Sequence, residues 1–262
     1  MRRRMSSDAP EKLAEGTLIS HLLELRDRLI RAVIVVAIAF VPCAMFANEL
    51  FTFVAHPLIE KLPKGATLIA TSVISPFMTP FKLALWAGVF IAMPYILYQL
   101  WAFVAPGLYR HEKRFAIPLL LSSIVLFYVG VAFAYFAVFP VMFEFFAQTT
   151  PDGVTMMTDI ASYMDFVTTI FFCFGLAFEV PVIVILLVLT GMMTIEKLVA
   201  ARGFVLIGIF LVAAILTPPD PISQTIMAVP MYLLYEGGLL MARLMMKMRR
   251  SPETEKDEEA EA

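Results

Sequence analysis

The sequence predicts an all-α, polytopic membrane protein, and three observations lead to that class. Of its 262 residues, 60% are hydrophobic and 16% are charged, whereas a soluble domain is nearer half apolar and a quarter charged. The mean hydropathy is +0.84. Several uncharged apolar runs exceed about 18 residues, the length at which a helix can cross a bilayer. The short alternating segments of a membrane β-barrel do not occur in the sequence.

Six membrane spans are predicted, and the last two are short. Fourteen helical residues in span five would measure about 21 Å, against a hydrocarbon core of about 30 Å. Both short spans meet at "TPPDPISQ" (217–224), where the hairpin is either shielded by neighbouring helices or thins the bilayer around it. The predicted spans are about 29–47, 76–100, 115–139, 166–193, 203–216 and 222–242.

Basic residues predict the orientation of these spans. Lysine and arginine concentrate in the N-terminal segment, in the loops 101–114 and 194–202, and in the C-terminal tail. The intervening loops carry only Lys61 and Lys64, and Lys82 can extend to the far interface. Because positive residues stay in the cytoplasm, both termini are expected to be cytoplasmic.

The chain divides into a membrane domain with two tails. Residues 1–16 are expected to form a cytoplasmic N-terminal tail, 17–245 the six-span domain, and 246–262 a disordered acidic tail. The semi-apolar loop 48–75 is expected to hold short interfacial helices, with Pro57 breaking any long one. No internal repeat of the kind found in inverted-repeat transporters is visible.

The sequence offers little for catalysis. All three histidines fall in loops or at interfaces, and no serine-hydrolase, P-loop or zinc-protease motif occurs. The cysteines, Cys43 and Cys173, lie inside apolar runs and are expected to pack as small hydrophobic residues. A net charge of −2 gives no reason to expect nucleic-acid binding. We therefore expect a protein that is not an enzyme and that needs no metal or cofactor.

Carboxylates among basic residues remain as candidates for function. The stretch "SHLLELRDRLIRAV" predicts an amphipathic helix with the i,i+4 pairs Glu24–Arg28 and Asp27–Arg31. The loop "APGLYRHEKR" surrounds Glu112 with basic side chains. Taken alone, the first stretch is typical of a salt-bridged surface helix, and the second is typical of an ordinary positive cytoplasmic loop.

Glu179 is the one charge in the fourth predicted span, and Pro181 follows it. A carboxylate at the centre of a membrane helix costs roughly 2.5–3.5 kcal/mol on insertion scales. Proline removes a backbone donor and disrupts the bond to the carbonyl of residue 177, which predicts a kink. Glu179 is either a structural carboxyl bonded to a neighbouring span or part of a hydrated, ligand-facing notch.

Taken together, these motifs resemble those of the TatC family, the multi-span receptor of the twin-arginine protein translocase. The resemblance covers about 17–245, and its order of motifs matches the predicted spans. The matching stretches are "HLLELRDRL", "SPFMTPFK", "YQLWAFVAPGLYRHEKR", "FYVGVAFAYFAVFP", "FGLAFEVPV" and "LTPPDPISQ".

The resemblance implies a fold and a transport function without catalysis. Such a protein forms a curved, cup-like wall of six helices in the bacterial inner membrane. It binds signal peptides carrying an Arg-Arg pair at the cytoplasmic face, as part of a multimeric receptor complex. With the single-span partners TatA and TatB it mediates export of folded precursors, driven by the proton-motive force.

The resemblance also implies roles for particular residues. Glu24, Arg26, Phe103 and Glu112 match the contact region for the twin-arginine signal. A guanidinium fits a carboxylate bidentately, so lysine in the signal is expected to bind less well. The other implied positions are the intramembrane polar site at Glu179 and Pro181, the partner-helix contacts Thr217 and Gln224, and the shape-sensitive positions Pro57 and Asp220.

Two further functions stay open on the residues alone. A proton-coupled small-solute transporter would use Glu179 as its proton site, because intramembrane carboxylates are typical of such proteins. The missing repeat and the lack of a second charge in mid-span weigh against it. A scaffold for other membrane proteins would tolerate changes at all three glutamates, provided that folding survives.

Overall fold

The computed structural model describes residues 9–60, 67–104, 116–150, 157–216 and 221–261, with side chains described from Ser20 to Lys247 within those ranges. Almost all of this chain is helical. Its elements are α1 (Ala9–Met45), α2 (Ala47–Ile59), β1 (Leu68–Ile69), α3 (Ser75–Val104), α4 (Ala116–Phe133), the π-helical segment η3 (Ala134–Val138), α5 (Phe139–Thr149), β2 (Thr158–Asp159), α6 (Ile160–Ala177), α7 (Val180–Leu189), α8 (Ile195–Ala200), α9 (Arg202–Leu216) and α10 (Pro221–Glu261).

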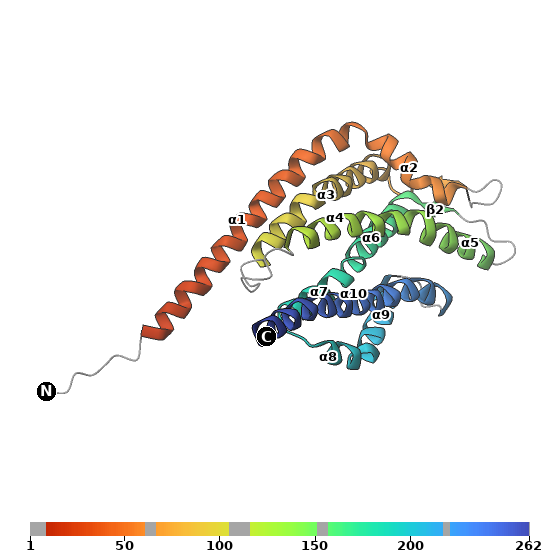
Figure 1. Ribbon diagram of the computed structural model, residues 1–262. Helices are drawn as coiled ribbons and strands as arrows, with labels where there is room; N and C mark the ends of the chain where they lie inside the picture. Colours follow the sequence, from red (N-terminus) through yellow and green to blue (C-terminus); the bar gives the residue numbers. More distant parts are fainter. Residues whose placement is uncertain (1–8, 61–66, 105–115, 151–156, 217–220, 262) are drawn as a thin grey trace.

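The helices form a curved wall rather than a closed bundle (Figure 1). On one side α1 packs along α3, and α4 packs on α6. On the other side α7 and α9 both pack against α10. The beginning of α1 and the end of α10 lie on the same side of the view, and β2 lies on the opposite side (Figure 1). We call the end that holds β1 and β2 the ribbon end.

Five helical segments of the described chain are long and apolar enough to cross a membrane. They correspond to the first, second, third, fourth and sixth predicted spans. The predicted fifth span is α9, which is apolar but only 15 residues long, so its predicted shortness is confirmed. The five segments are Ser20–Met45, Ser75–Phe103, Ala116–Thr149, Ile160–Leu189 and Pro221–Lys247.

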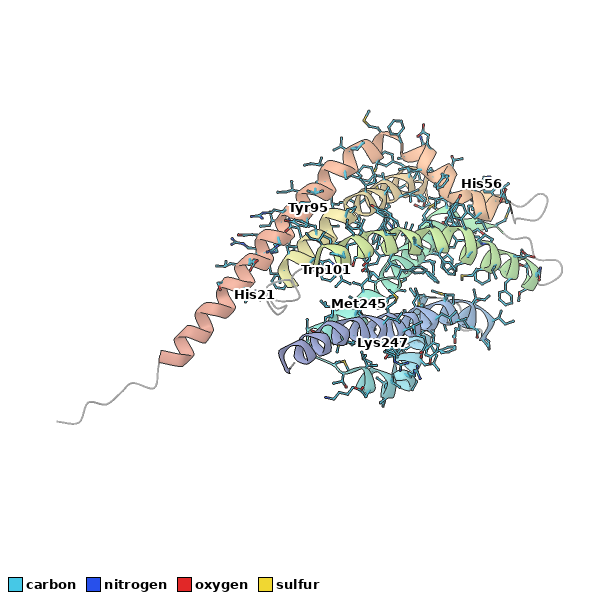
Figure 2. The ribbon with its side chains drawn as sticks, in the orientation of Figure 1. His21, His56, Tyr95, Trp101, Met245 and Lys247 are labelled. Atoms are coloured by element: carbon cyan, nitrogen blue, oxygen red, sulfur yellow. The ribbon has the colours of Figure 1, made fainter. Side chains whose placement is uncertain are left out.

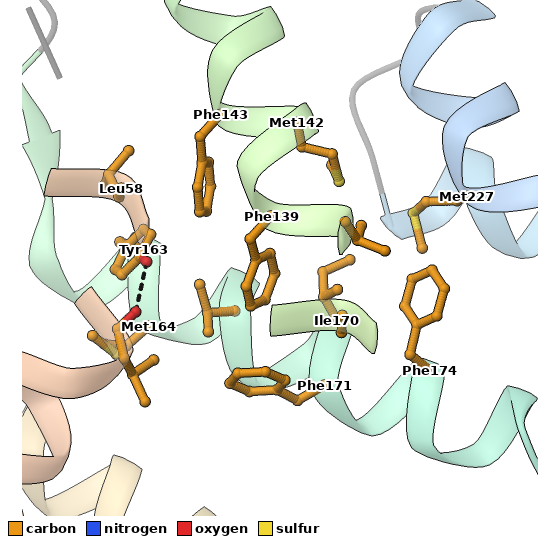
Figure 3. Close-up of a cluster of buried hydrophobic side chains, with 14 of the residues drawn as sticks. Leu58, Phe139, Met142, Phe143, Tyr163, Met164, Ile170, Phe171, Phe174 and Met227 are labelled. Atoms are coloured by element: carbon orange, nitrogen blue, oxygen red, sulfur yellow. Dashed lines mark hydrogen bonds between the residues drawn. The ribbon is translucent and has the colours of Figure 1, made fainter. Parts of the chain in front are cut away.

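The main core lies toward the ribbon end, where α2, η3, α5 and α6 meet (Figure 3). Phe139, Phe174 and Met142 are fully buried there. The Tyr163 hydroxyl donates to the Val54 carbonyl at 3.0 Å, which satisfies a polar group inside this aromatic cluster. The core therefore fixes α2 and α5 onto α6 at one end of the molecule.

Small residues let α4 and α6 approach closely. A Cβ built on Gly130 would lie 2.5 Å from the Phe174 carbonyl oxygen, and one on Gly175 would lie 2.5 Å from the Phe127 ring. No side chain fits at such distances. The two glycines therefore set the spacing of these helices, as small residues do in membrane proteins.

The loop 48–75 contains a short helix, α2, as expected, and Pro57 lies buried in its last turn. Proline cannot donate to the Phe53 carbonyl four residues earlier, and that carbonyl accepts instead from the Tyr135 hydroxyl at 3.0 Å. The tail from 246 was predicted to be disordered, whereas α10 continues to Glu261. Its glutamate, alanine and lysine residues are strong helix formers, which favours that extension.

A short parallel ribbon joins two loops that the sequence treats separately. Leu68 pairs with Thr158 and Ile69 with Asp159. The Asp159 carboxylate then accepts bonds from the Thr71 amide at 3.1 Å and the Ser162 amide at 3.0 Å. The bond from the Ser162 amide, together with those from Thr71, lowers the pKa of Asp159 to about 2. Asp159 thus caps α6 and ties the first connecting segment to it.

Candidate functional site

The first candidate site lies where α1 meets the end of α3. The predicted Glu24–Arg28 pair is confirmed: the Arg28 guanidinium donates to Glu24 Oε1 from Nε at 3.1 Å and from Nη2 at 2.5 Å. Arg28 Nη1 also lies 3.4 Å from Oε1 of Gln99 on α3. Gln99 had no signal in the sequence, because this contact depends on how two distant helices pack.

An aromatic stack borders this carboxylate. The rings of His21 and Phe103 are 4.1 Å apart between centroids and nearly parallel. His21 Nδ1 lies 3.9 Å from Oε2 of Glu24, which is too far for a hydrogen bond. His21 lies on α1 near the end of α3 and on the same side as Trp101 (Figure 2). A flat face beside a carboxylate is well suited to a guanidinium, which stacks and forms bidentate bonds.

The structure brings together only part of the predicted signal-binding set. Glu24 and Phe103 lie in this site, whereas Arg26 points to its neighbour Asp27, with 2.8 Å between Nη2 and Oδ1. Asp27 therefore pairs with Arg26, and the predicted Asp27–Arg31 pair is wrong. Glu112 lies outside the described residues.

The second candidate site surrounds Glu179 at a break between α6 and α7. The break confirms the predicted kink: α6 ends at Ala177, and α7 begins at Val180 with Pro181 in its first turn. Glu179 is 7% exposed, and its Oε1 atom has no hydrogen-bond partner among the described residues. Its carboxyl interacts with the Ser123 hydroxyl of α4.

A cavity of about 290 Å³ lies beside Glu179, between α3, α4 and α7. It is almost wholly apolar, with Leu97, Leu100, Val182 and Ile183 among its lining residues. The Trp101 indole donates to Ser123 Oγ at 3.2 Å, which orients the hydroxyl next to the carboxyl. The cavity is large enough in volume to hold water, and Glu179 is one of its lining residues.

The two sites share the last turns of α3. Gln99 and Phe103 contact α1, while Leu100 and Trp101 line the Glu179 cavity. Helical periodicity explains this arrangement, because residues separated by one or two positions point to different faces. A ligand that moved the end of α3 at the first site would therefore also move one wall of the second.

The predicted partner-docking positions are only partly described. Thr217 and Asp220 lie outside the described residues, while Gln224 is half-buried in the first turn of α10. An interaction that the sequence missed lies on the same helix, where Glu236 accepts from Arg202 at 2.6 Å and from Tyr232 at 3.0 Å. In the sequence, the only indication of this interaction was that Glu236 is the single acidic residue of the sixth predicted span.

Lys82 forms an ion pair that the sequence did not indicate. Its ammonium lies 3.0 Å from Oδ1 and 3.1 Å from Oδ2 of Asp165 on α6. Both side chains are more than half exposed. The pair joins α3 to α6 near the ribbon end.

These features define a class: a multi-pass α-helical membrane protein with a carboxylate beside an aromatic stack at one end and a buried carboxyl at a helix break. Comparison with known families identifies which family within this class the chain belongs to. The family described as Sec-independent protein translocase protein (TatC) matches residues 20–230, and the chain belongs to that family.

Individual relatives agree over nearly the whole length. The chain is 54% identical to the Sec-independent protein translocase protein TatC of Haemophilus influenzae, over 86% of this chain and 88% of the relative. It is 50% identical to the protein of the same name from Escherichia coli strain K12, over 90% and 92%. A crystal structure described as the twin arginine translocase receptor TatC superposes with a TM-score of 0.76 at 38% identity, covering 86% of this chain and 98% of that one.

Proposed function

We propose that this protein is the receptor subunit of a twin-arginine translocase and binds the Arg-Arg pair of signal peptides at the site formed by Glu24, His21 and Phe103. The main support for this proposal is the position of the Glu24 carboxylate beside the stacked rings of His21 and Phe103. This combination offers a guanidinium both an ionic acceptor and a stacking surface. Glu112 is proposed to supply a second carboxylate, and Arg26 to border the surface.

The proposed orientation places this site in the cytoplasm. Basic residues before and within the first part of α1, and in the C-terminal part of α10, support cytoplasmic termini in a bacterial inner membrane. Precursors would then meet the site before they enter the membrane. TatA and TatB are the proposed partners in a multimeric receptor complex, with Thr217 and Gln224 on their docking surface and export driven by the proton-motive force. Pro57 and Asp220 are proposed to preserve the shape of the ribbon-end segments.

Glu179 is proposed to act after signal recognition. Its Oε1 has no hydrogen-bond partner among the described residues and its side chain borders an apolar cavity, so a polar group of the signal or of a partner helix could bind this oxygen without displacing an existing bond. The solute-transporter alternative is not favoured, because relatives along the full chain are named as protein translocase subunits.

Site-specific photocrosslinking in inner-membrane vesicles tests the proposal. A probe placed beside the Arg-Arg pair of a precursor signal should crosslink to the wild-type protein. We expect at least a tenfold weaker crosslink for Glu24→Ala/Glu112→Ala, which corresponds to about 1.4 kcal/mol. Undiminished crosslinking and export in the folded double variant would reject the proposed receptor site.

A further inference from the structure

The Glu24 carboxylate is already occupied by a guanidinium of its own chain. Both Arg28 bonds, from Nε and Nη2, converge on the single oxygen Oε1. The second oxygen, Oε2, has His21 Nδ1 at 3.9 Å, which is outside hydrogen-bond range. Oε1 of the proposed recognition carboxylate is therefore bonded to Arg28. The expected ligand, an arginine pair, carries the same guanidinium group as Arg28.

Arg28 is held more firmly than its neighbours on α1. Its side chain is 20% exposed, compared with 63% for Arg26. It lies in the seam between α1 and α3, where Nη1 faces Oε1 of the buried Gln99. Arg28 therefore has two acceptors within reach, a charged one on its own helix and a neutral one on α3.

We propose that Arg28 is an internal competitor of the twin-arginine ligand: in the unliganded protein it bonds to both Glu24 and Gln99, and when a signal guanidinium binds it gives up Glu24 and keeps only its bond to Gln99. This inference rests on the proposed function. The exchange preserves the pairing of Glu24, because one guanidinium replaces another. It also leaves the displaced Arg28 with a hydrogen-bond acceptor, so that no buried charge is left without a partner.

Competition of this kind lowers the affinity of the receptor for its ligand. When only a fraction of the receptor has Glu24 free, the apparent Kd equals the intrinsic Kd divided by that fraction, so the ligand binds more weakly. Weak, reversible binding suits a receptor that must release each precursor to the next step. The alternative role for Arg28 is to hold Glu24 in the correct position, and that role predicts the opposite change when Arg28 is removed.

The test measures equilibrium binding of a fluorescent twin-arginine signal peptide to the full-length protein in lipid nanodiscs. Arg28→Gln should bind the peptide about three- to tenfold more tightly than wild type, as expected for removing a partly exposed, charge-assisted pair. Arg28→Lys keeps the charge but loses the planar guanidinium, so its affinity for the peptide should lie between those of wild type and Arg28→Gln. Arg31→Gln is the matched control, because it removes the same charge one turn further along α1 from an exposed position.

Gln99 provides a second, independent readout. Gln99→Leu removes the one acceptor that a displaced Arg28 would keep, so displacement of Arg28 becomes harder and the peptide should bind severalfold more weakly. In an Arg28→Gln background the same substitution should have no effect, because nothing remains to be displaced. A role for Gln99 in packing alone would weaken binding equally in both backgrounds.

The possible results test internal competition by Arg28 separately from the proposed receptor function. Weaker or unchanged binding in Arg28→Gln, relative to Arg31→Gln, would overturn internal competition while the receptor function stands. Equal effects of Gln99→Leu in both backgrounds would overturn it as well. Wild-type binding that does not depend on the arginine pair or on Glu24 would overturn the proposed function and this inference with it.

Discussion

At the scale of single residues, the fold gives two glutamates opposite environments. Glu24 is partly exposed and paired with Arg28, as its spacing on an amphipathic helix predicts. Glu179 is buried beside an apolar cavity with one unpartnered oxygen. The first arrangement suits exchange with a charged ligand, whereas the second retains a polar group where an apolar one would pack more favourably.

Replacing Glu179 should separate stability from function. Glu179→Leu removes the unpartnered oxygen Oε1 together with the contact to the Ser123 hydroxyl, so the two effects offset and the free energy of unfolding should change by no more than about 1 kcal/mol. Export should nevertheless fall, if the carboxyl acts on the signal or on a partner helix. Thermal unfolding in detergent and export by cells that depend on this protein provide the two measurements.

Glu179→Gln is the control, since it keeps the size and one acceptor oxygen of the side chain and replaces the carboxyl by a neutral amide that cannot ionise. A leucine variant that unfolds well below the wild-type temperature would show that the carboxyl is structural. Full export by the leucine variant would remove Glu179 from the mechanism.

At the scale of helices, close approach and interruption shape the wall. The break at Glu179 follows from Pro181, which cannot donate to the carbonyl of Ala177. The π-helical segment η3 in the third span had no comparable signal in the sequence. The Gly130 and Gly175 contacts also arise from packing, because a glycine in an apolar run does not indicate which helix will approach it.

Gly130→Ala should loosen the contact between α4 and α6. Its Cβ would meet the Phe174 carbonyl oxygen at 2.5 Å, and backbone cannot move aside as a side chain can. We expect a loss of roughly 1–3 kcal/mol in the free energy of unfolding, as for other overpacked sites. Equilibrium unfolding in mixed detergent micelles measures it.

Gly208→Ala on α9 is the matched control, because a Cβ there has nothing within 4 Å. It should be neutral or stabilising by up to about 1 kcal/mol, since alanine favours helix. Equal losses in both variants would mean that the α4–α6 contact is not the cause.

At the scale of the whole molecule, the sequence predicted the membrane class, the approximate spans and the short fifth helix, because each depends on local hydrophobicity. It also predicted the Glu24–Arg28 pair, which lies within one helix. It did not predict the His21–Phe103 stack, the Gln99 contact or the link between Asp159 and Thr71. These contacts join segments far apart in the chain, so their signal lies in tertiary packing rather than in any local pattern.

Asp159 makes the ribbon end sensitive to acid. Because its pKa is lowered from an ordinary 3.8 to about 2, its stabilising bonds are complete above pH 4 and are lost as the pH falls toward 2. Hydrogen exchange at the Thr71 and Ser162 amides, corrected for intrinsic rates, should accelerate across that range.

In Asp159→Ala, which removes the accepting oxygens, the same two amides should exchange rapidly already at pH 4, with little further change on acidification. Amides of the α9 interior serve as an internal reference. Wild-type protection that stays constant from pH 4 to pH 2 would contradict the assigned role of this carboxylate.

The most direct test of the receptor function compares arginine and lysine in one binding measurement. Signal peptides carrying Arg-Arg or Lys-Lys before the same apolar segment are titrated against the purified protein in nanodiscs, with wild type beside Glu24→Gln. We predict that the arginine peptide binds wild type at least tenfold more tightly than the lysine peptide, and that Glu24→Gln removes most of that difference. Equal binding of the two peptides to wild type, or a preference for arginine that persists undiminished in Glu24→Gln, would contradict recognition at this site.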